Sequence, residues 1–201
     1  MDMTDFFIFN SKLISSTFQA QPLNLDQNGS QEGLFDHHRL IMGNYENIQF
    51  PVIFVQEYGT KLLDILDTGH ANLFLISDKL REILMKNQLT GWKTFPVQIF
   101  DKKENEIYQY HGFSITGRCG PLNFAKSEII EKRQRPAAPL RKYFRGLVFE
   151  QEQWDGADFF LSQGWFFVII TSKVADILNK SNISNLDLMN VSNVEISITD
   201  I

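Results

Sequence analysis

One local pattern occurs twice in this sequence: an apolar stretch, a hydroxyl residue, apolar residues at helical spacing, and a second apolar stretch. In the first copy residues 73–76 are apolar, Ser77 follows, and Leu80, Ile83 and Leu84 recur as one helix face. The matching residues of the second copy are Phe167–Ile170, Thr171, Val174, Ile177 and Leu178. Thr171 follows Ser77 by 94 residues, and the other pairs have the same separation. Because Ser and Thr are typical helix N-caps, each copy predicts a strand, a capped helix and a further strand.

These two copies favour an α+β fold with mixed or antiparallel sheets, built around two similar strand–helix–strand units. Ordinary α/β units that share the pattern by chance are the alternative. Further strands are predicted at 6–9, 49–55, 94–100 and 107–110, whereas 11–33 has the composition of a loop with one brief element. We expect one globular unit, in which an N-terminal strand and loop region, 1–68, packs on the region 69–201.

Between the two copies lies a segment, 111–164, with many glycines, prolines and basic residues. Gly117, Gly120 and Pro121 are typical of a tight turn, and Pro136 and Pro139 interrupt any continuous helix. We therefore predict a loop-rich insertion rather than an independent domain.

Composition narrows the classes of function. The chain is 43% hydrophobic with 18 Phe, enough for a sizeable core, and its net charge of −5 repels phosphate backbones and anionic lipid. Cys119 is the single cysteine, so no intramolecular disulfide forms. The longest apolar run, Trp165–Ile170, is too short to span a bilayer, and the acidic N-terminus is unlike a signal peptide. We expect a cytosolic protein without a membrane partner.

Two candidate chemical sites are weakly supported. His37 and His38 are potential metal ligands, but adjacent residues point to different faces and no third ligand has a suitable spacing. Cys119 beside Arg118 could act as a nucleophile with His111 as its base, although a lone cysteine in a turn is more often a small buried residue. We therefore expect no cofactor and no metal.

The basic stretch Lys132–Arg145 is the candidate for nucleic-acid binding, with Tyr143 and Phe144 as stacking faces. The acidic net charge makes a solvated loop or a partner-facing surface the stronger interpretation.

An acidic counterpart follows it. Glu150, Glu152, Asp155 and Asp158 flank Trp154, and Asp155 with Asp158 could form an acid–base pair. The alternative is structural, since Trp154-Asp155-Gly156 is a good turn and Asp158 could bind loop amides.

Three motifs resemble a bacterial family of polymorphic-toxin immunity proteins, immunity protein family eleven. They are Gly112–Pro121, Lys126-Ser127-Glu128 and Trp154–Phe160, and the resemblance covers roughly residues 73–196. It implies a non-enzymatic protein that binds and neutralises a toxin in the cytosol, with no catalytic residues to transfer. If the toxin is a basic nuclease, we expect an acidic contact surface. The candidate partner-binding residues are Glu150, Glu152, Trp154, Asp155, Asp158 and Arg118.

Overall fold

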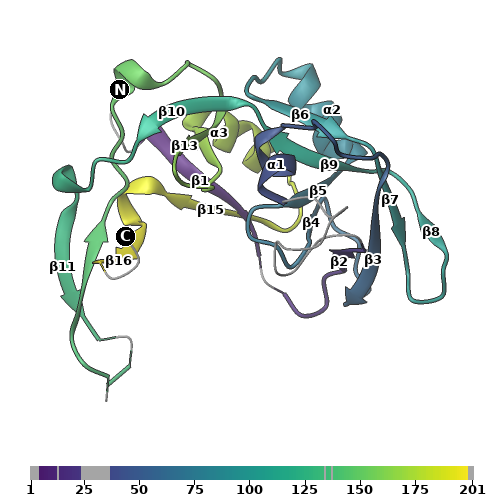
Figure 1. Cartoon of the computed structure of the whole chain (residues 1–201), viewed down its shortest axis with the longest axis horizontal. Coiled ribbons are helices and arrows are strands. Elements are labelled where there is room, and N and C mark those ends of the chain that lie inside the picture. The colour runs from purple at the N-terminus through teal and green to yellow at the C-terminus, as the bar shows by residue number, and fades with distance from the viewer. Residues whose placement is uncertain (1–4, 13, 24–36, 134, 137, 199–201) are drawn as a thin grey trace.

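The computed structural model describes residues 5–12, 14–23, 37–133, 135–136 and 138–198. Within these ranges the chain forms four β-sheets and three α-helices, a mostly-β α+β fold. Figure 1 shows an arch, with a β-hairpin descending at one end and a small sheet at the other. The predicted fold class is confirmed at this level.

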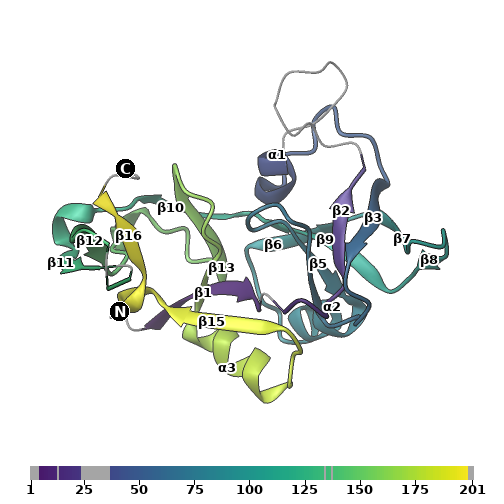
Figure 2. The ribbon, with the colours of Figure 1, turned by 90° about the horizontal axis from the view of Figure 1, so that it is seen from below.

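A five-stranded sheet has the order β10-β13-β14-β1-β15. Its strands are β1 (Phe6–Ser11), β10 (Gly117–Pro121), β13 (Phe159–Gln163), β14 (Ile169–Thr171) and β15 (Leu186–Asn190). β1 is antiparallel to both β14 and β15, so the N-terminal strand lies between strands from the end of the chain. Figure 2 shows β1 and β15 side by side, with helix α3 (Ser172–Lys180) against them.

A second sheet has the order β4-β5-β9-β6. Its strands are β4 (Ile65–Asp67), β5 (Phe74–Ser77), β6 (Trp92–Phe95) and β9 (Tyr110–Ile115). Helix α2 (Asp78–Lys86) follows β5 directly, and Ser77 Oγ accepts a hydrogen bond from the Leu80 amide at 3.2 Å. The predicted cap is therefore confirmed. Thr171 occupies the equivalent place before α3, but its hydroxyl makes no capping hydrogen bond to that helix.

A third sheet, β2-β3-β7-β8, lies beside helix α1 (His37–Met42). Its strands are β2 (Gln19–Pro22), β3 (Val52–Tyr58), β7 (Val97–Phe100) and β8 (Glu106–Ile107). The single strand predicted at 94–100 is wrong, because the chain passes from β6 to β7 at Pro96 and changes sheet there. Proline has no amide hydrogen to continue a ladder, so it marks such a break. The predicted loop at 11–33 lies partly outside the described residues, and β2 is the described element within it.

The fourth sheet, β11-β12-β16, forms the descending end of the arch. Its strands are β11 (Glu128–Lys132), β12 (Arg141–Arg145) and β16 (Glu195–Ser197). We call the β11–β12 hairpin with its connection, 128–145, the arm. Short 3₁₀ turns lie at Phe124–Lys126, Gln151–Gln153 and Val191–Asn193.

The segment 111–164 is richer in strands than predicted, since β10, β11, β12 and β13 all lie in it. The expected tight turn at Gly117–Pro121 is strand β10, paired in parallel with β13. Its glycine serves close packing: a Cβ on Gly117 would lie 2.2 Å from the Phe159 carbonyl oxygen. A glycine inside a strand often marks such a close approach, and sequence alone does not separate this role from a turn.

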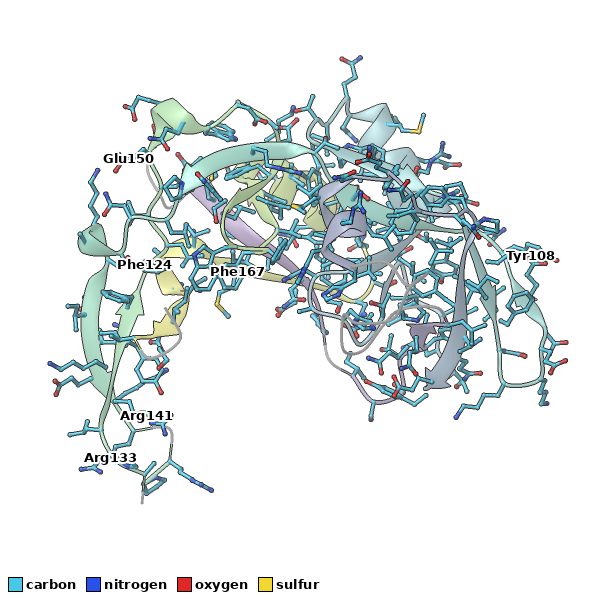
Figure 3. The ribbon with its side chains drawn as sticks, viewed as in Figure 1. Tyr108, Phe124, Arg133, Arg141, Glu150 and Phe167 are labelled. Atoms are coloured by element: carbon cyan, nitrogen blue, oxygen red, sulfur yellow. The ribbon has the colours of Figure 1, made fainter. Side chains whose placement is uncertain are left out.

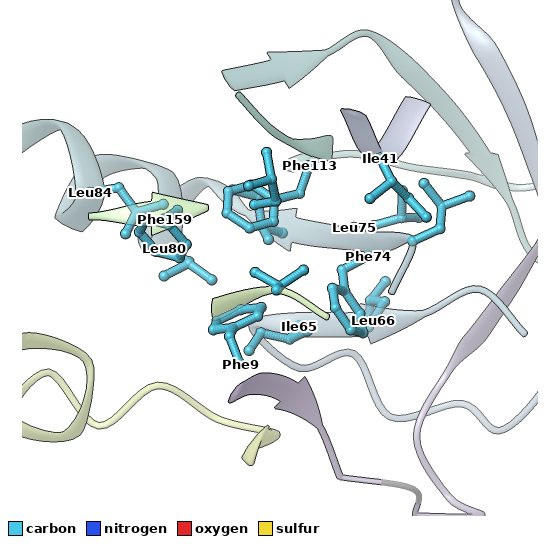
Figure 4. Close-up of a cluster of buried hydrophobic side chains, with 14 of the residues drawn as sticks. Phe9, Ile41, Ile65, Leu66, Phe74, Leu75, Leu80, Leu84, Phe113 and Phe159 are labelled. Carbon is cyan, nitrogen blue, oxygen red and sulfur yellow. The ribbon is translucent and has the colours of Figure 1, made fainter. Parts of the chain in front are cut away.

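The core joins the two larger sheets. The Phe9 ring lies 5.7 Å from that of Phe74, 5.8 Å from Phe113 and 6.0 Å from Phe159, so β1 bridges both sheets. Figure 4 shows side chains of α1, α2 and both sheets meeting in this cluster. Burying a large apolar side chain contributes about 1.5–3 kcal/mol, so this contact holds the sheets as one body.

Candidate functional site

The Trp154–Phe160 motif docks on strand β10. The Arg118 amide donates to Asp155 Oδ2 at 2.7 Å, and the Asp155 amide donates to the Arg118 carbonyl at 3.1 Å. Asp155 Oδ1 also accepts from the Ala157 amide at 3.0 Å, which closes a local turn. The Trp154 ring packs edge-on against Phe6 at 5.4 Å. The structure thus brings the glycine-rich stretch and the acidic motif together, through structural contacts.

Asp158 is buried, with 8% of its surface exposed, and its carboxylate binds other residues of the chain. Its Oδ2 accepts from the Thr90 amide at 2.9 Å and the Thr90 hydroxyl at 3.2 Å. Its Oδ1 accepts from the Thr171 hydroxyl at 3.4 Å, and Lys173 Nζ lies 3.3 Å away. Because β6 follows Thr90 and β14 ends at Thr171, Asp158 ties the two larger sheets together.

Asp64 connects the same two sheets from the other strand–helix–strand unit. Its Oδ2 accepts from the Ser184 amide at 2.8 Å and from Lys79 Nζ at 3.0 Å, and its Oδ1 accepts from the Ser77 hydroxyl at 2.9 Å. Burial raises the pKa of Asp64, but the hydrogen bonds from Ser184, Lys79 and Ser77 outweigh it, so the pKa lies below its ordinary value. Sequence analysis did not single out Asp64. It precedes Asp158 by 94 residues, which is the separation of the two copies of the repeated pattern.

The other predicted contact residues differ in exposure. Glu152 is exposed. Glu150 is half-buried, and its Oε1 accepts hydrogen bonds from Lys126 Nζ at 2.8 Å and from Asn123 Nδ2 at 2.9 Å. The Arg118 guanidinium donates to the Met42, Ile115 and Gly117 carbonyls. Burial lowers the pKa of Arg118, while Asp155 opposes that shift. Of the acidic residues in the motif, Glu152 and Asp155 are the exposed ones.

The two residues of the suggested nucleophilic pair have separate partners. Cys119 is buried, its thiol donates to the Gly120 carbonyl at 3.4 Å, and burial raises its pKa to about 12. His111 Nε2 lies 2.6 Å from Asp78 Oδ1. A thiol with so high a pKa holds almost no thiolate at neutral pH, so this pair does not form an activated nucleophile. Asp155 and Asp158 likewise bind different groups and do not form an acid–base pair.

A groove of about 750 Å³ lies on the concave side of the arch. We call it the central groove. Strands β1 and β15 contribute Ile8, Asn10, Asp187 and Met189, and Figure 3 shows Phe167 on the same side. The remaining lining residues are Gln19, Asp67, Gly69, His70, Ala71, Asn72, Lys132, Tyr143, Asn193, Val194 and Glu195. The β4–β5 turn and the arm therefore form two separate walls.

The groove is acidic with an apolar floor. Asp67 accepts from Gln19 Nε2 at 2.8 Å, and Glu195 pairs with Lys132. Asp187 is exposed, and its carboxylate has no hydrogen bond or ion pair among the described residues. Met189 is 48% exposed and adds apolar surface to the groove.

Two residues that line the groove each hold a buried oxygen without a partner within the described residues. These oxygens are Gln19 Oε1 and Tyr143 OH, whose residues are 7% and 6% exposed. A buried oxygen without a hydrogen bond costs about 1–3 kcal/mol, so such atoms are rare unless a ligand or water binds them. They lie on β2 and β12, in different walls of the groove.

Three of the four histidines, His37, His38 and His70, lie together at the groove. The His37 ring lies 4.0 Å from His38 and 4.9 Å from His70, and His38 stacks on Phe166 at 3.9 Å. Burial lowers the pKa of His70, with Asp67 and Glu57 opposing. Over the described part of the chain no cluster of three or more potential ligands is placed to hold a metal ion.

Sequence reasoning missed the groove because its lining comes from segments far apart in the chain. The one local signal was the alternation of side chains along strand 186–190, which places Asp187 and Met189 on the same face of the sheet.

Comparison with known proteins adds the family. The model of the immunity protein family Imm11 matches residues 11–193, a wider region than the resemblance suggested. No curated protein matches the sequence. Among the described helices none has the length and apolar character needed to cross a membrane. Family membership implies a toxin-neutralising role, and such proteins are typically non-enzymatic inhibitors. The chain belongs to the immunity protein family Imm11.

Proposed function

We propose that this protein binds a cognate toxin domain in the cytosol and neutralises it without chemistry of its own, and that the central groove receives the toxin. The observation that carries this proposal is the pair of buried oxygens, Gln19 Oε1 and Tyr143 OH, which have no partner among the described residues and belong to side chains in separate walls of one groove. A bound polypeptide segment with amide donors would satisfy both once the surrounding side chains move aside.

The groove also suggests the chemistry of that segment. Within the described part of the chain, Asp187 carries an unpaired carboxylate, and the exposed Met189 and the half-buried Phe167 line the same groove. A loop that carries a Lys or Arg flanked by apolar side chains would complement this surface. The toxin surface that enters the groove is therefore basic and partly apolar.

The test begins with the tagged chain purified from its native bacterium and the bound protein identified by mass spectrometry. Met189→Arg places a bulky cation in the groove, and we expect it to weaken binding of the recovered toxin at least about tenfold. Met85→Arg is the matched control, because Met85 is 55% exposed on α2 and does not line the groove. Equal binding by M189R and wild type would refute the groove assignment.

The acidic motif remains a second candidate contact surface. Glu150, Trp154, Asp155, Asp158 and Arg118 make internal contacts, so reversing their charge would test folding as well as binding. Glu152 is exposed, which makes Glu152→Lys the cleaner variant. Unchanged toxin binding by E152K would remove the motif as a contact.

We also propose that the two strand–helix–strand units are structural repeats. Sheet orders β4-β5-β9-β6 and β13-β14-β1-β15 have helices α2 and α3 at corresponding places. Asp64 binds Ser77, Lys79 and Ser184, whereas Asp158 binds Thr171, Lys173 and Thr90. Each carboxylate thus contacts its own unit and the opposite one, as pseudo-twofold symmetry requires. If the units are equivalent, Asp64→Ala and Asp158→Ala should destabilise the protein by similar amounts.

A further inference from the structure

The tip of the arm carries three exposed guanidinium groups without carboxylate partners. Arg133, Arg135 and Arg141 are exposed, and no ion pair joins them to an acidic side chain in the described part of the chain. Among the described residues, the one hydrogen bond from their side chains is from Arg133 Nη1 to the Ala138 carbonyl at 2.6 Å. Figure 3 shows Arg133 and Arg141 at the far end of the arm, away from the body.

Basic residues nearer the body are paired instead. Lys142 lies 3.8 Å from Glu131, and Arg145 lies 3.1 Å from Glu195. Within the described part of the arm, positive charge without an acidic partner is therefore confined to the tip. Because the chain has a net charge of −5, these three arginines form a local positive patch on an acidic protein.

Two exposed apolar residues lie on the arm. Leu140, which immediately precedes Arg141 and β12, is 54% exposed, and Ile129 is 59% exposed nearer the body, where it pairs with Phe144. Arginine is enriched in protein–protein interfaces, where its guanidinium fork binds a carboxylate through two parallel hydrogen bonds.

The structure disfavours nucleic acid at the arm. The proposed stacking residues are not available, because Tyr143 is 6% exposed and Phe144 packs against Phe124 at 5.2 Å. Single-stranded nucleic acid is held largely by stacking on exposed aromatic rings. The remaining acidic surface of the protein would also repel a phosphate backbone.

We propose that the arm tip binds a carboxylate-rich surface of the same partner protein that occupies the central groove. This inference rests on the proposed function for the identity of the partner. The arm and the groove are continuous, since Lys132 and Tyr143 line the groove and Lys132 lies 4.9 Å above the Tyr143 ring. The partner therefore presents a basic segment to the groove and an acidic patch to the arm, which fixes its orientation.

The test uses a probe that does not require the toxin. The probe is a fluorescein-labelled peptide of about 12 residues in which glutamates alternate with glycines and leucines, measured by anisotropy at about 20 mM salt. We expect the wild-type chain to bind it and R133Q/R135Q/R141Q to bind about tenfold more weakly, as for the loss of several exposed ion pairs. Binding should also weaken at about 200 mM salt.

The control is K102Q/K103Q, which removes two exposed lysines from the tip of another hairpin, β7–β8. It should bind the peptide like the wild type. Failure to bind the peptide, or equal binding by the arginine variant, would overturn the arm assignment. Tighter binding of a single-stranded DNA of equal charge would overturn it in favour of nucleic acid. Arginine-dependent self-association in sedimentation would overturn it in favour of a second copy of this chain.

The two proposals fail separately. Met189→Arg should leave binding of the acidic peptide unchanged, because Met189 lies in the groove and not on the arm. The arginine variant should retain part of the affinity for the recovered toxin through the groove. Loss of peptide binding in M189R would mean that the peptide occupies the groove, and it would reject the arm.

Discussion

Asp64 and Asp158 are buried acidic residues, whereas the guanidinium groups of the arm tip are exposed to solvent. Asp64 and Asp158 are 9% and 8% exposed, and each binds groups from both strand–helix–strand units. The arginines of the arm tip, Arg133, Arg135 and Arg141, are exposed and have no acidic partner among the described residues. Paired buried charge is a feature of folding, whereas unpaired exposed charge is available to a partner. The comparison predicts that substitutions at Asp64 and Asp158 lower the stability of the fold, whereas substitutions at the arm tip weaken partner binding.

The largest expected effect comes from removing the Asp158 carboxylate. Asp158→Ala removes a buried carboxylate that accepts from the Thr90 amide and the Thr171 hydroxyl, so we expect the free energy of unfolding to fall by about 2 kcal/mol. Urea denaturation followed by tryptophan fluorescence measures this change. Asp176→Ala is the control, since Asp176 is exposed on the same helix as Lys173. A loss below about 1 kcal/mol would mean that the Asp158 contacts do not hold the sheets together.

The stability that Asp64 contributes also depends on pH, and this effect is smaller than the loss of either carboxylate. Because its folded pKa is lowered, Asp64 contributes stability that is present above the unfolded pKa, about 3.9, and lost as pH falls through the lower folded pKa. The wild type should therefore lose stability on acidification below about pH 4 more steeply than Asp64→Asn. Urea midpoints between neutral pH and about pH 2.5 give both slopes. Parallel slopes would show that Asp64 titrates alike in the folded and unfolded chain.

Local signals predicted helices α2 and α3 but not α1. Ser77 caps α2, and the apolar residues Leu80 and Leu84 face the core, because both features depend on neighbours within one helical turn. Helix α3 begins and ends at the matching positions and buries Val174 and Leu178, although Thr171 makes no capping hydrogen bond. The Pro96 break was also readable in the sequence, yet the apolar character of 94–100 favoured one strand.

Long-range pairing could not be predicted in this way. Strand β1 inserts between β14 and β15, and nothing near Phe6–Ser11 specifies those partners. The same limit applies to charge: Asp158 and Glu152 belong to one acidic stretch, but one binds Thr90 and the other is exposed. The groove combines residues as distant as Gln19 and Glu195, so it exists only in the folded chain.

The smallest expected effect on stability sharpens the comparison from the other side. Substituting the three arm arginines, R133Q/R135Q/R141Q, removes no carboxylate contact in the described chain, so the free energy of unfolding should change by less than about 0.5 kcal/mol. The same urea experiment measures it beside Asp158→Ala. A loss comparable with that of D158A would mean that the arginines serve folding, and weaker peptide binding by the variant would then reflect damage to the fold. A change within the expected limit, together with weaker binding of the acidic peptide, assigns the charge of the arm to recognition.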